Sequence, residues 1–323
     1  MTSVVDKAVH RPKALLLSAR TDYACDHVVA ALRQSGIPYL RLNSEDLENS
    51  QVALTPSEPR LRVCTAGSEF LVEPDSLTGI LFRRPVYLRE SAAAGSGAER
   101  LARAQWGVFV RSLMVFEEIR WVNHPARVYL AEHKAIQLLA ARQVGFRVPE
   151  TTITNSPRYL PSGPGQLAIK GLDAILYAEG EHEFFGYTQL VERSTLAAEN
   201  LAALPTVVQT AVVPKLDLRV TVVGNEMWCA EIHGRTGSIA GDWRELKDAV
   251  TYRPREMPEE LRQRVLALMG RLGLVYAAID LAEQGGEIYF LEVNPTGEWA
   301  WLERQLGFPV SQALCRQLSG DRS

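Results

Sequence analysis

The chain has 323 residues, of which 46% are hydrophobic and 23% charged, and its formal net charge is −3. Two or three packed units are expected at this length, and the near-neutral charge argues against a nucleic-acid partner. The four cysteines are widely spaced, and no stretch approaches the roughly 20 apolar residues that span a bilayer, so we expect a cytoplasmic protein with reduced thiols and no membrane partner.

The first third of the chain alternates short strands with helices. Residues 14–18 form an apolar run, residues 25–34 carry apolar side chains at helical spacing, and residues 37–42 are typical of a second strand. No glycine-rich dinucleotide fingerprint follows the first strand, so a Rossmann cofactor is not expected. We expect further strands in one small sheet, and one long helix, at residues 61–64, 69–72, 79–82 and 98–119.

The pattern changes after Asn123. Residues 129–144 predict one amphipathic helix that ends at Gly145, and residues 259–272 predict another. Because strands follow one another here without intervening helices, the sequence favours an α+β fold. The antiparallel strands are expected at residues 166–170, 184–191, 206–209, 216–223 and 227–233.

Two oxygen-bearing side chains, Glu292 and Asn294, lie two residues apart in an otherwise apolar strand, and so project from the same face. A turn at residues 284–286 would fold Asp280 back beside them in a hairpin. Three oxygen donors in reach of one ion suit Mg²⁺. The alternative is an edge strand that ends in solvent, although carboxylates next to a residue as apolar as Phe290 need a partner to offset desolvation.

Basic residues follow the neighbouring strands. Period-two spacing places Lys215, Asp217 and Arg219 on one strand face. The alternative is a solvated charged face. Four cations are candidates to neutralise a transferring phosphoryl group near the metal cluster, namely Lys134, Lys170, Arg219 and Arg235.

An apolar strand at residues 206–213 runs into an extended linker. Such a segment offers backbone N–H and C=O groups to the edge of an adenine ring, although an ordinary core strand explains it equally well. The chain contains neither a Walker lysine loop nor a Gly-x-Ser-x-Gly nucleophile motif.

The order of these parts resembles the ATP-grasp superfamily of carboxylate–amine ligases, in its RimK-like branch, over residues 123–318. Four stretches are similar to the graspetide synthetases, the microviridin-type maturases that close side-chain ester or amide rings in ribosomal peptides; they are Arg83-Arg84-Pro85, residues 215–224, Asp242-Trp243-Arg244 and residues 291–303. The resemblance implies an ATP-grasp fold with an N-terminal α/β pre-ATP-grasp domain, a central small α+β domain and a C-terminal antiparallel-sheet domain with the metal site, at residues 1–122, 123–210 and 211–323.

The resemblance also implies ATP and Mg²⁺ as cofactors and a ribosomally made precursor peptide, with leader and core, as the partner. An Asp or Glu of that peptide would become an acyl phosphate that a hydroxyl or amine of the same peptide attacks. Arg219 and Arg235 would stabilise the acyl phosphate. The residues implied to hold nucleotide are Lys134, Lys170, Gln209, Thr210, Ala211, Val212 and Asp217, and those implied to hold the metal are Asp280, Glu292 and Asn294.

The chain departs from the family pattern at two places. Gln209-Thr210 stands where relatives commonly have Gln-Glu, and the acidic residues 177–182 stand in place of a glycine-rich phosphate lid and could instead meet a peptide. Two other functions fit the pattern: a RimK-like ligase that adds free amino acids to a carboxylate, and a non-catalytic nucleotide- or peptide-binding module. The family resemblance suggests a homodimer, with the helix at residues 98–119 as interface or core.

Overall fold

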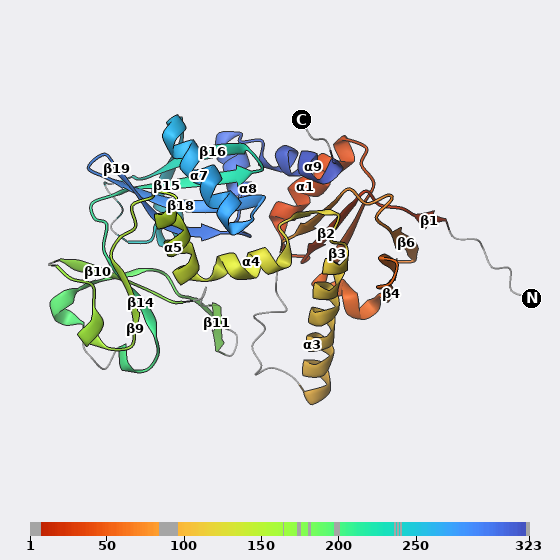
Figure 1. Ribbon diagram of the computed structural model, residues 1–323, viewed down its shortest axis with the longest axis horizontal. Helices are drawn as coiled ribbons and strands as arrows, with labels where there is room; N and C mark the ends of the chain where they lie inside the picture. The colour runs from red at the N-terminus through yellow and green to blue at the C-terminus, as the bar shows by residue number, and fades with distance from the viewer. Residues whose placement is uncertain are drawn as a thin grey trace, which may run out of the picture.

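The computed structural model describes residues 8–83, 96–163, 165–172, 176–179, 182–196, 201–235, 237, 239 and 241–320, without the side chains of residues 176–185, 247 and 248. The described strands form five sheets. In Figure 1 the N-terminal sheets lie on the right, the large C-terminal sheet at the upper left, and the central sheet below it.

The N-terminal part is built on a parallel sheet of strand order β3-β2-β7-β8. Its elements are β2 (Ala14–Ser18), α1 (Tyr23–Gln34), β3 (Tyr39–Asn43), β7 (Gly79–Phe82), α3 (Gly97–Ser112), η2 (Leu113–Val115) and β8 (Arg120–Val122). Successive residues of β2 enter different cores: Leu16 packs with α1, whereas Leu15 and Leu17 pack with residues of α3 and η2. Because both faces are covered, the strand is a continuous apolar run.

A second sheet of order β1-β6-β5-β4 flanks the first. Its strands are β1 (Val9–His10), β4 (Gln51–Thr55), β5 (Arg60–Thr65) and β6 (Ser68–Val72), with η1 (Ser44–Asn49) before β4. The prediction of one small sheet is therefore wrong. Ala66 and Gly67, both at positive φ, form a two-residue hairpin turn between β5 and β6. These two strands therefore pair with each other and not with β7.

The central part is an antiparallel sheet of order β13-β10-β14-β9 with a separate hairpin, β11–β12. The elements are β9 (Thr151–Thr154), η3 (Pro157–Tyr159), β10 (Gln166–Lys170), β11 (Leu176–Glu179), β12 (His182–Phe185), β13 (Gln189–Glu192), η4 (Arg193–Thr195) and β14 (Thr206–Thr210). The single strand predicted at residues 184–191 is wrong, because β12 and β13 belong to different sheets.

The C-terminal part is an antiparallel sheet of order β17-β16-β15-β18-β19. Its elements are β15 (Leu216–Val223), β16 (Glu226–Gly234), η5 (Trp243–Ala249), β17 (Val250–Arg255), α7 (Glu259–Leu272), β18 (Tyr276–Gln284), β19 (Glu287–Asn294), α8 (Ala300–Leu306) and α9 (Val310–Ser319). Helix α7 packs on one face through a core that includes Leu268, Val220 and Phe290. Helix α9 packs against β15 of this sheet and also against α1, β7 and β8 of the N-terminal part. The predicted helix at residues 259–272 and the hairpin before the C-terminus are confirmed.

Two helices connect the parts, α4 (Pro125–Glu132) and α5 (Lys134–Gln143), and both pack on α7 and β19. The single helix predicted at residues 129–144 is wrong, because the chain is extended at His133. The Gln137 side chain donates a hydrogen bond to the freed Ala131 carbonyl at 2.6 Å and to the Val293 carbonyl at 2.9 Å, which stabilises the break and ties α5 to β19. The predicted domain boundary at residue 123 stays a prediction.

The long helix predicted at residues 98–119 is shorter. Helix α3 ends at Ser112, and after η2 the chain turns at Phe116, which is buried and whose carbonyl accepts a hydrogen bond from Trp121 Nε1. In the part of the chain that the structure describes, no helix combines the length and apolar character that crossing a bilayer requires.

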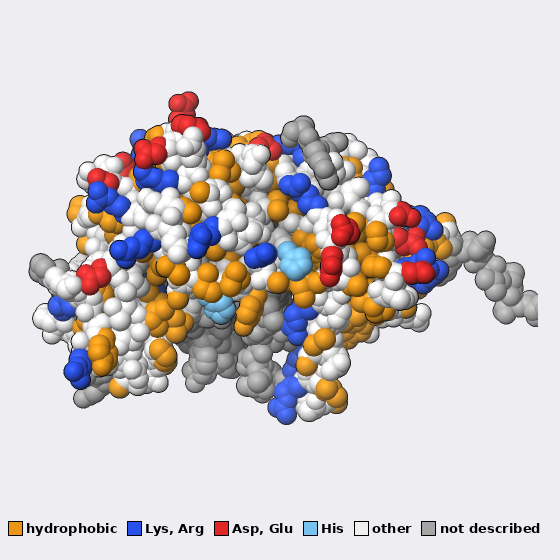
Figure 2. Space-filling view, viewed as in Figure 1, with side chains coloured by type: hydrophobic (Ala, Val, Ile, Leu, Met, Phe, Trp, Pro, Cys, Tyr) orange, Lys and Arg blue, Asp and Glu red, His pale blue; other side chains and the backbone are white. Residues whose placement is uncertain are grey.

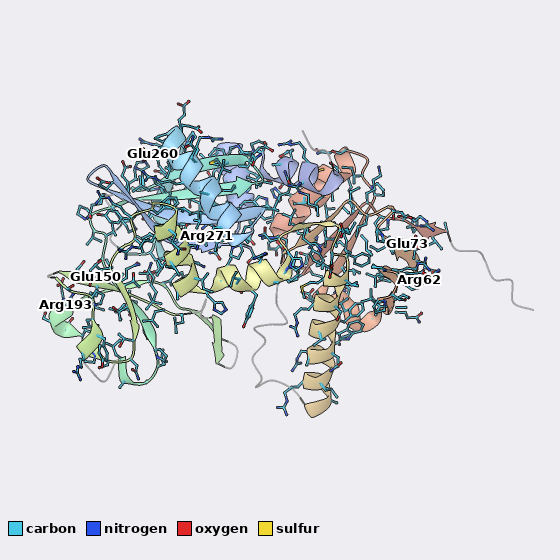
Figure 3. The ribbon with its side chains drawn as sticks, viewed as in Figure 1. Arg62, Glu73, Glu150, Arg193, Glu260 and Arg271 are labelled. Carbon is cyan, nitrogen blue, oxygen red and sulfur yellow. The ribbon has the colours of Figure 1, made fainter. Side chains whose placement is uncertain are left out.

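Charged side chains that have no part in the site lie over the outside of all three parts. Figure 3 marks Arg62 and Glu73 on the N-terminal sheet, Glu150 and Arg193 on the central sheet, and Glu260 on α7. Their ion pairs, such as Arg62 with Glu69 and Arg264 with Glu260, are partly exposed and each stabilises the fold by at most about 1 kcal/mol.

Candidate active site

A cavity lies between the central sheet and the C-terminal sheet. The central part provides Ala168, Lys170, Thr188, Leu190, Gln209, Thr210 and Val212 to its lining, and the C-terminal part provides Lys215, Asp217, Gly241, Asp242, Trp243, Arg244, Asp280, Leu291 and Glu292. The lining combines apolar side chains with charged ones; the apolar ones are Ala168, Leu190, Val212, Trp243 and Leu291, and the charged ones are Lys170, Lys215, Asp217, Asp242, Arg244, Asp280 and Glu292.

The β18–β19 hairpin brings two carboxylates together as predicted. Gly285 and Gly286, both at positive φ, form its turn, and Asp280 lies opposite Glu292. Next to this pair the register shifts, since Leu281 pairs with Phe290 and leaves Leu291 as an extra residue. Such a bulge sets two residues opposite one, so Leu291 and Glu292 both line the cavity.

Cationic groups hold all four oxygens of these carboxylates. Asp280 Oδ1 accepts from Arg219 Nη1 at 2.8 Å, and Arg244 Nη2 lies 3.4 Å from Asp280 Oδ2. Glu292 Oε1 accepts from Arg244 Nη2 at 2.7 Å, and Oε2 accepts from Lys134 Nζ at 3.1 Å. The contacts span three separate segments of the chain, so the two acids form the centre of a charged cluster.

The two carboxylates differ in their electrostatics. Burial raises the pKa of Asp280, although Arg219 and Arg244 oppose the change. Burial alone would raise the pKa of Glu292 as well, but Lys134, Arg244 and Lys170 hold it well below its ordinary value. Glu292 is therefore the firmly ionised member of the pair.

The donor set suits a hard divalent cation, because two carboxylates with their oxygens turned to one cavity are the ligands that Mg²⁺ takes from proteins. Within the described residues no cluster of three His, Cys, Asp or Glu side chains could hold a metal, and the predicted third ligand is an amide. Asn294 lies two residue pairs beyond Glu292, opposite Ala278, and is not part of the cavity lining. The structure thus brings Asp280 and Glu292 together and leaves Asn294 beside them.

Two lysines reach the site from different elements. Lys134 is the first residue of α5, which the Gln137 side chain fixes to β19, and its ammonium contacts Glu292. Lys170 ends β10 and lines the cavity. Burial lowers the pKa of Lys170, and no described carboxylate forms an ion pair with it. A cation placed in this way is available to an anionic ligand.

The predicted adenine segment borders the cavity with backbone groups that are largely in use. The Thr210 N–H donates to the Glu150 carbonyl at 2.9 Å and the Ala211 N–H to the Gln166 carbonyl at 3.0 Å. The Gln209 side chain donates to Thr151 Oγ1 at 2.8 Å. No described residue accepts a hydrogen bond from the Val212 N–H, so this amide is the one left for a ligand.

Asp217 and Arg219 share one face of β15, as the spacing predicts. Asp217 lines the cavity and pairs with Lys215; burial raises the pKa of Asp217 to about 6 despite that lysine. Arg219 is buried behind Asp280, is not part of the lining, and has no partner for its Nε among the described residues. In this arrangement Arg219 orients Asp280.

The fourth predicted cation does not join the cluster. Arg235 follows β16, its side chain is exposed, and it is not part of the cavity lining. Arg244 takes the place near the carboxylates instead, and no role was predicted for it. The sequence does contain one local signal for Arg244, which is the nearby Asp242. The Asp242 carboxylate accepts hydrogen bonds from the Arg244 backbone N–H at 3.1 Å and from the Arg244 Nε at 3.0 Å.

Arg83 connects the N-terminal sheet to the loop after β19. It is buried against Asp22, donates to the carbonyls of Thr296 and Gly297 at 2.9 and 3.0 Å, and lies 4.2 Å from the ring centre of Trp299. This loop touches the site, because Glu298 O lies 3.5 Å from Arg219 Nη2. Arg84 and Pro85, and residues 180 and 181 of the predicted lid, lie outside the described residues.

Comparison with known proteins identifies the fold. No protein-family model matches the chain, and no curated protein matches it. Among solved structures, macrocyclase MdnC of Microcystis aeruginosa bound with precursor peptide MdnA is 23% identical, covers 94% of this chain and 99% of its own, and has a TM-score of 0.77. A RiPP-associated ATP-grasp ligase of Chryseobacterium gregarium, in complex with ADP and a leader and core peptide, is 21% identical, covers 98% of both chains, and has a TM-score of 0.78.

A third similar structure is the ATP-grasp ligase PsnB complexed with minimal precursor, Mg and ADP, at 19% identity, with 95% of this chain and 96% of the other covered and a TM-score of 0.71. These likenesses span nearly the whole chain. The predicted α+β ATP-grasp fold is confirmed.

Proposed function

We propose that this ATP-grasp protein is an ATP-dependent carboxylate ligase that phosphorylates Asp or Glu side chains of a ribosomal precursor peptide and closes side-chain ester or amide macrocycles, releasing ADP and phosphate. The observation that carries the proposal is the pair Asp280–Glu292 at a cavity that Lys170 and Arg244 also line. The solved structures of similar fold support the substrate class, because two of them contain precursor or leader and core peptides together with ADP.

The nucleotide would lie between the two sheets. The purine would pack against Ala168, Leu190 and Leu291, with its edge at Val212, and Asp217 would hold the ribose. Lys134 and Lys170 would contact the phosphates. Asp280 and Glu292, with the predicted Asn294, would hold Mg²⁺, which when bound neutralises phosphate charge and orients the transferring group.

The reaction needs no protein nucleophile. A carboxylate oxygen of the substrate attacks the γ-phosphorus, the bond to the bridging oxygen breaks, and ADP leaves. The hydroxyl oxygen or amine nitrogen of the acceptor side chain then attacks the acyl carbon, the bond to the phosphate oxygen breaks, and the acceptor's proton leaves to phosphate or solvent. Cations around the cavity lower the cost of bringing two anions together, and this electrostatic term is usually the largest in such reactions. The role predicted for Arg235 stays a prediction.

The test is the mass of a candidate precursor peptide encoded by a neighbouring gene, incubated with the protein, ATP and Mg²⁺. The proposal expects loss of one water per ring, whereas addition of free amino acids would raise the mass. Glu292→Gln should abolish turnover. Glu287→Gln is the matched control on the same strand, since this residue pairs with Arg147 at the exposed end of β19. Full turnover by Glu292→Gln would refute the assignment.

We also infer that the protein acts in the cytoplasm as a homodimer. None of the four cysteines forms a disulfide bond, as expected in a reducing compartment. Helix α3 exposes 62% of Leu101 and 48% of Val108, and Figure 2 shows hydrophobic side chains along this projecting helix at the lower right. Exposed apolar side chains on one helix favour self-association. Light scattering should give a dimer for the wild type and a monomer for Leu101→Glu.

A further inference from the structure

Arg244 lies where a metal ion would have to bind. A single nitrogen, Nη2, is 2.7 Å from Glu292 Oε1 and 3.4 Å from Asp280 Oδ2, so one guanidinium bridges both carboxylates. The same side chain is anchored at its other side, because Nε donates to Asp242 Oδ1 at 3.0 Å. Asp242 is buried and also accepts from the Arg244 backbone N–H, so the anchor is rigid.

A divalent cation needs carboxylate oxygens, and cations already hold all four of them. One partner must therefore give way. Arg219 is the least able to move, since its side chain is 6% exposed, and Lys134 is 18% exposed at the first turn of a packed helix. The Arg244 side chain is 34% exposed and touches both acids, so its departure frees one oxygen of each.

We propose that Arg244 is the resident counter-ion of the Asp280–Glu292 pair and that it and the divalent cation exclude one another there. The inference rests on the proposed function and deepens it. The metal replaces the guanidinium between the two carboxylates, and the guanidinium, still held at Nε by Asp242, stays at the cavity and binds an oxyanion of the nucleotide phosphates. Arg244 thus changes partners when metal and nucleotide arrive together.

The exchange has a physical purpose. Two carboxylates directly opposite on neighbouring strands repel each other. The guanidinium between them offsets this repulsion and holds the pair in place until the metal arrives. Binding metal and nucleotide together then costs less than binding either alone. The metal gives the two carboxylates a cation in place of Arg244, and a nucleotide phosphate gives Arg244 an anion in place of the carboxylates.

The test compares Arg244→Gln with the wild type by calorimetric titration of Mg²⁺, first into nucleotide-free protein and then at saturating ADP. Without the competing guanidinium, Mg²⁺ affinity of the nucleotide-free protein should rise about tenfold or more, the factor that corresponds to one charge-assisted hydrogen bond. ADP affinity at saturating Mg²⁺ should fall. Opposite changes in two affinities are not what a merely structural role would produce.

Arg253→Gln is the matched control, because it removes the same charge from an exposed position on β17 of the same sheet; its Mg²⁺ affinity should stay within about twofold of the wild type. Arg244→Lys is the second test variant, used in case Arg244→Gln does not fold. The shorter reach of Lys should give an intermediate Mg²⁺ affinity, and thermal unfolding verifies that each variant is folded.

The outcomes separate the inference from the proposed function. The counter-ion role is overturned if Arg244→Gln and Arg244→Lys bind Mg²⁺ as the wild type does, or more weakly, both without nucleotide and at saturating ADP. In that case the ligase proposal still stands, provided that ADP binding by the wild type depends on Mg²⁺. If the wild type shows no Mg²⁺-dependent ADP binding at all, the ligase proposal itself fails.

Discussion

The buried Arg83 offers a sharp test of how the N-terminal sheet supports the site. In Arg83→Met, Asp22 keeps its hydrogen bonds from Ser18 Oγ and the Cys25 N–H but loses its only described cationic partner, 3.3 Å away. Both side chains of this pair are at most 2% exposed. Breaking a buried pair costs about 3–5 kcal/mol, chiefly because a charge is left buried without compensation.

The other contacts of Arg83 add to this figure. Glu298 lies 2.8 Å from Arg83 Nη2, but its side chain is 56% exposed, so that pair contributes at most about 1 kcal/mol. The contact with the Trp299 ring adds about 1–2 kcal/mol. We therefore expect a loss of about 4–8 kcal/mol of unfolding free energy at neutral pH.

The assay is a double-mutant cycle with Asp22→Asn, measured by urea unfolding. The double variant leaves no buried charge, so its loss of unfolding free energy should be smaller than the sum of the two single losses by at least about 1 kcal/mol.

The pH dependence of this stability has a definite sign. Burial alone would raise the pKa of Asp22, and Arg83 and the hydrogen bonds hold it below its ordinary value, so this group stabilises the fold above its unfolded pKa and loses that effect as pH falls.

Without Arg83 the Asp22 carboxyl takes up a proton more readily, so the cost of Arg83→Met should be smaller at about pH 5 than at about pH 7.5. Losses that are additive in the cycle and equal at both pH values would refute the reasoning.

Three further predictions concern the cavity and its surroundings. Lys170→Met should weaken ATP binding by about tenfold or more in an equilibrium titration, because a cation that lines the cavity is removed; unchanged affinity would place the phosphates elsewhere. Since the pKa of Asp217 is raised to about 6, the folded state binds its proton more tightly than the unfolded state, and this group's contribution to stability falls by about 2 kcal/mol as pH rises from about 4 to about 6; Asp217→Asn should remove that part of the slope in urea unfolding. Gly297→Ala would set a Cβ 2.5 Å from Ala278 Cβ and 2.9 Å from Arg219 Nη2, so melting should show a loss of about 1–3 kcal/mol with reduced activity, whereas wild-type stability would contradict the close packing.

Local patterns predicted most single elements. Continuous apolar runs marked β2 and β7, helical periodicity marked α1 and α7, and the glycine turn with its flanking strands marked the β18–β19 hairpin. These signals depend on neighbours in the chain, which is why they can be read without a structure.

Other features depend on partners distant in sequence. The break at His133 needs the Gln137 side chain to satisfy a freed carbonyl and to reach β19. Strands β12 and β13 separate because each finds a different neighbour. The sheet to which a strand belongs is set by such pairings and by burial, which intrinsic preference does not specify.

The candidate site divides in the same way. Asp280 and Glu292 were predictable because a hairpin register places them opposite each other. The bulge at Leu291 was not predictable from the sequence. It turns both Leu291 and Glu292 to the cavity, whereas strict strand alternation predicts opposite faces for two successive residues. Arg244 reaches both acids from a segment that has no hydrophobic periodicity, so the nearby Asp242 was the one sequence feature that indicated a role for Arg244.

Helix α9 has a consequence for how this protein is made on the ribosome. Residues Ala313, Leu314 and Leu318 complete the same core as Leu16 of β2, and the Leu318 carbonyl accepts a hydrogen bond from Thr78 Oγ1 at 2.6 Å. The apolar face of the first sheet that carries Leu16 is thus covered only in part, by α1, until α9 has been translated nearly 300 residues after β2. A nascent chain in that state is a client for chaperones, and stop codons just before residue 310 should yield insoluble protein even though every residue of the ligand cavity has been made.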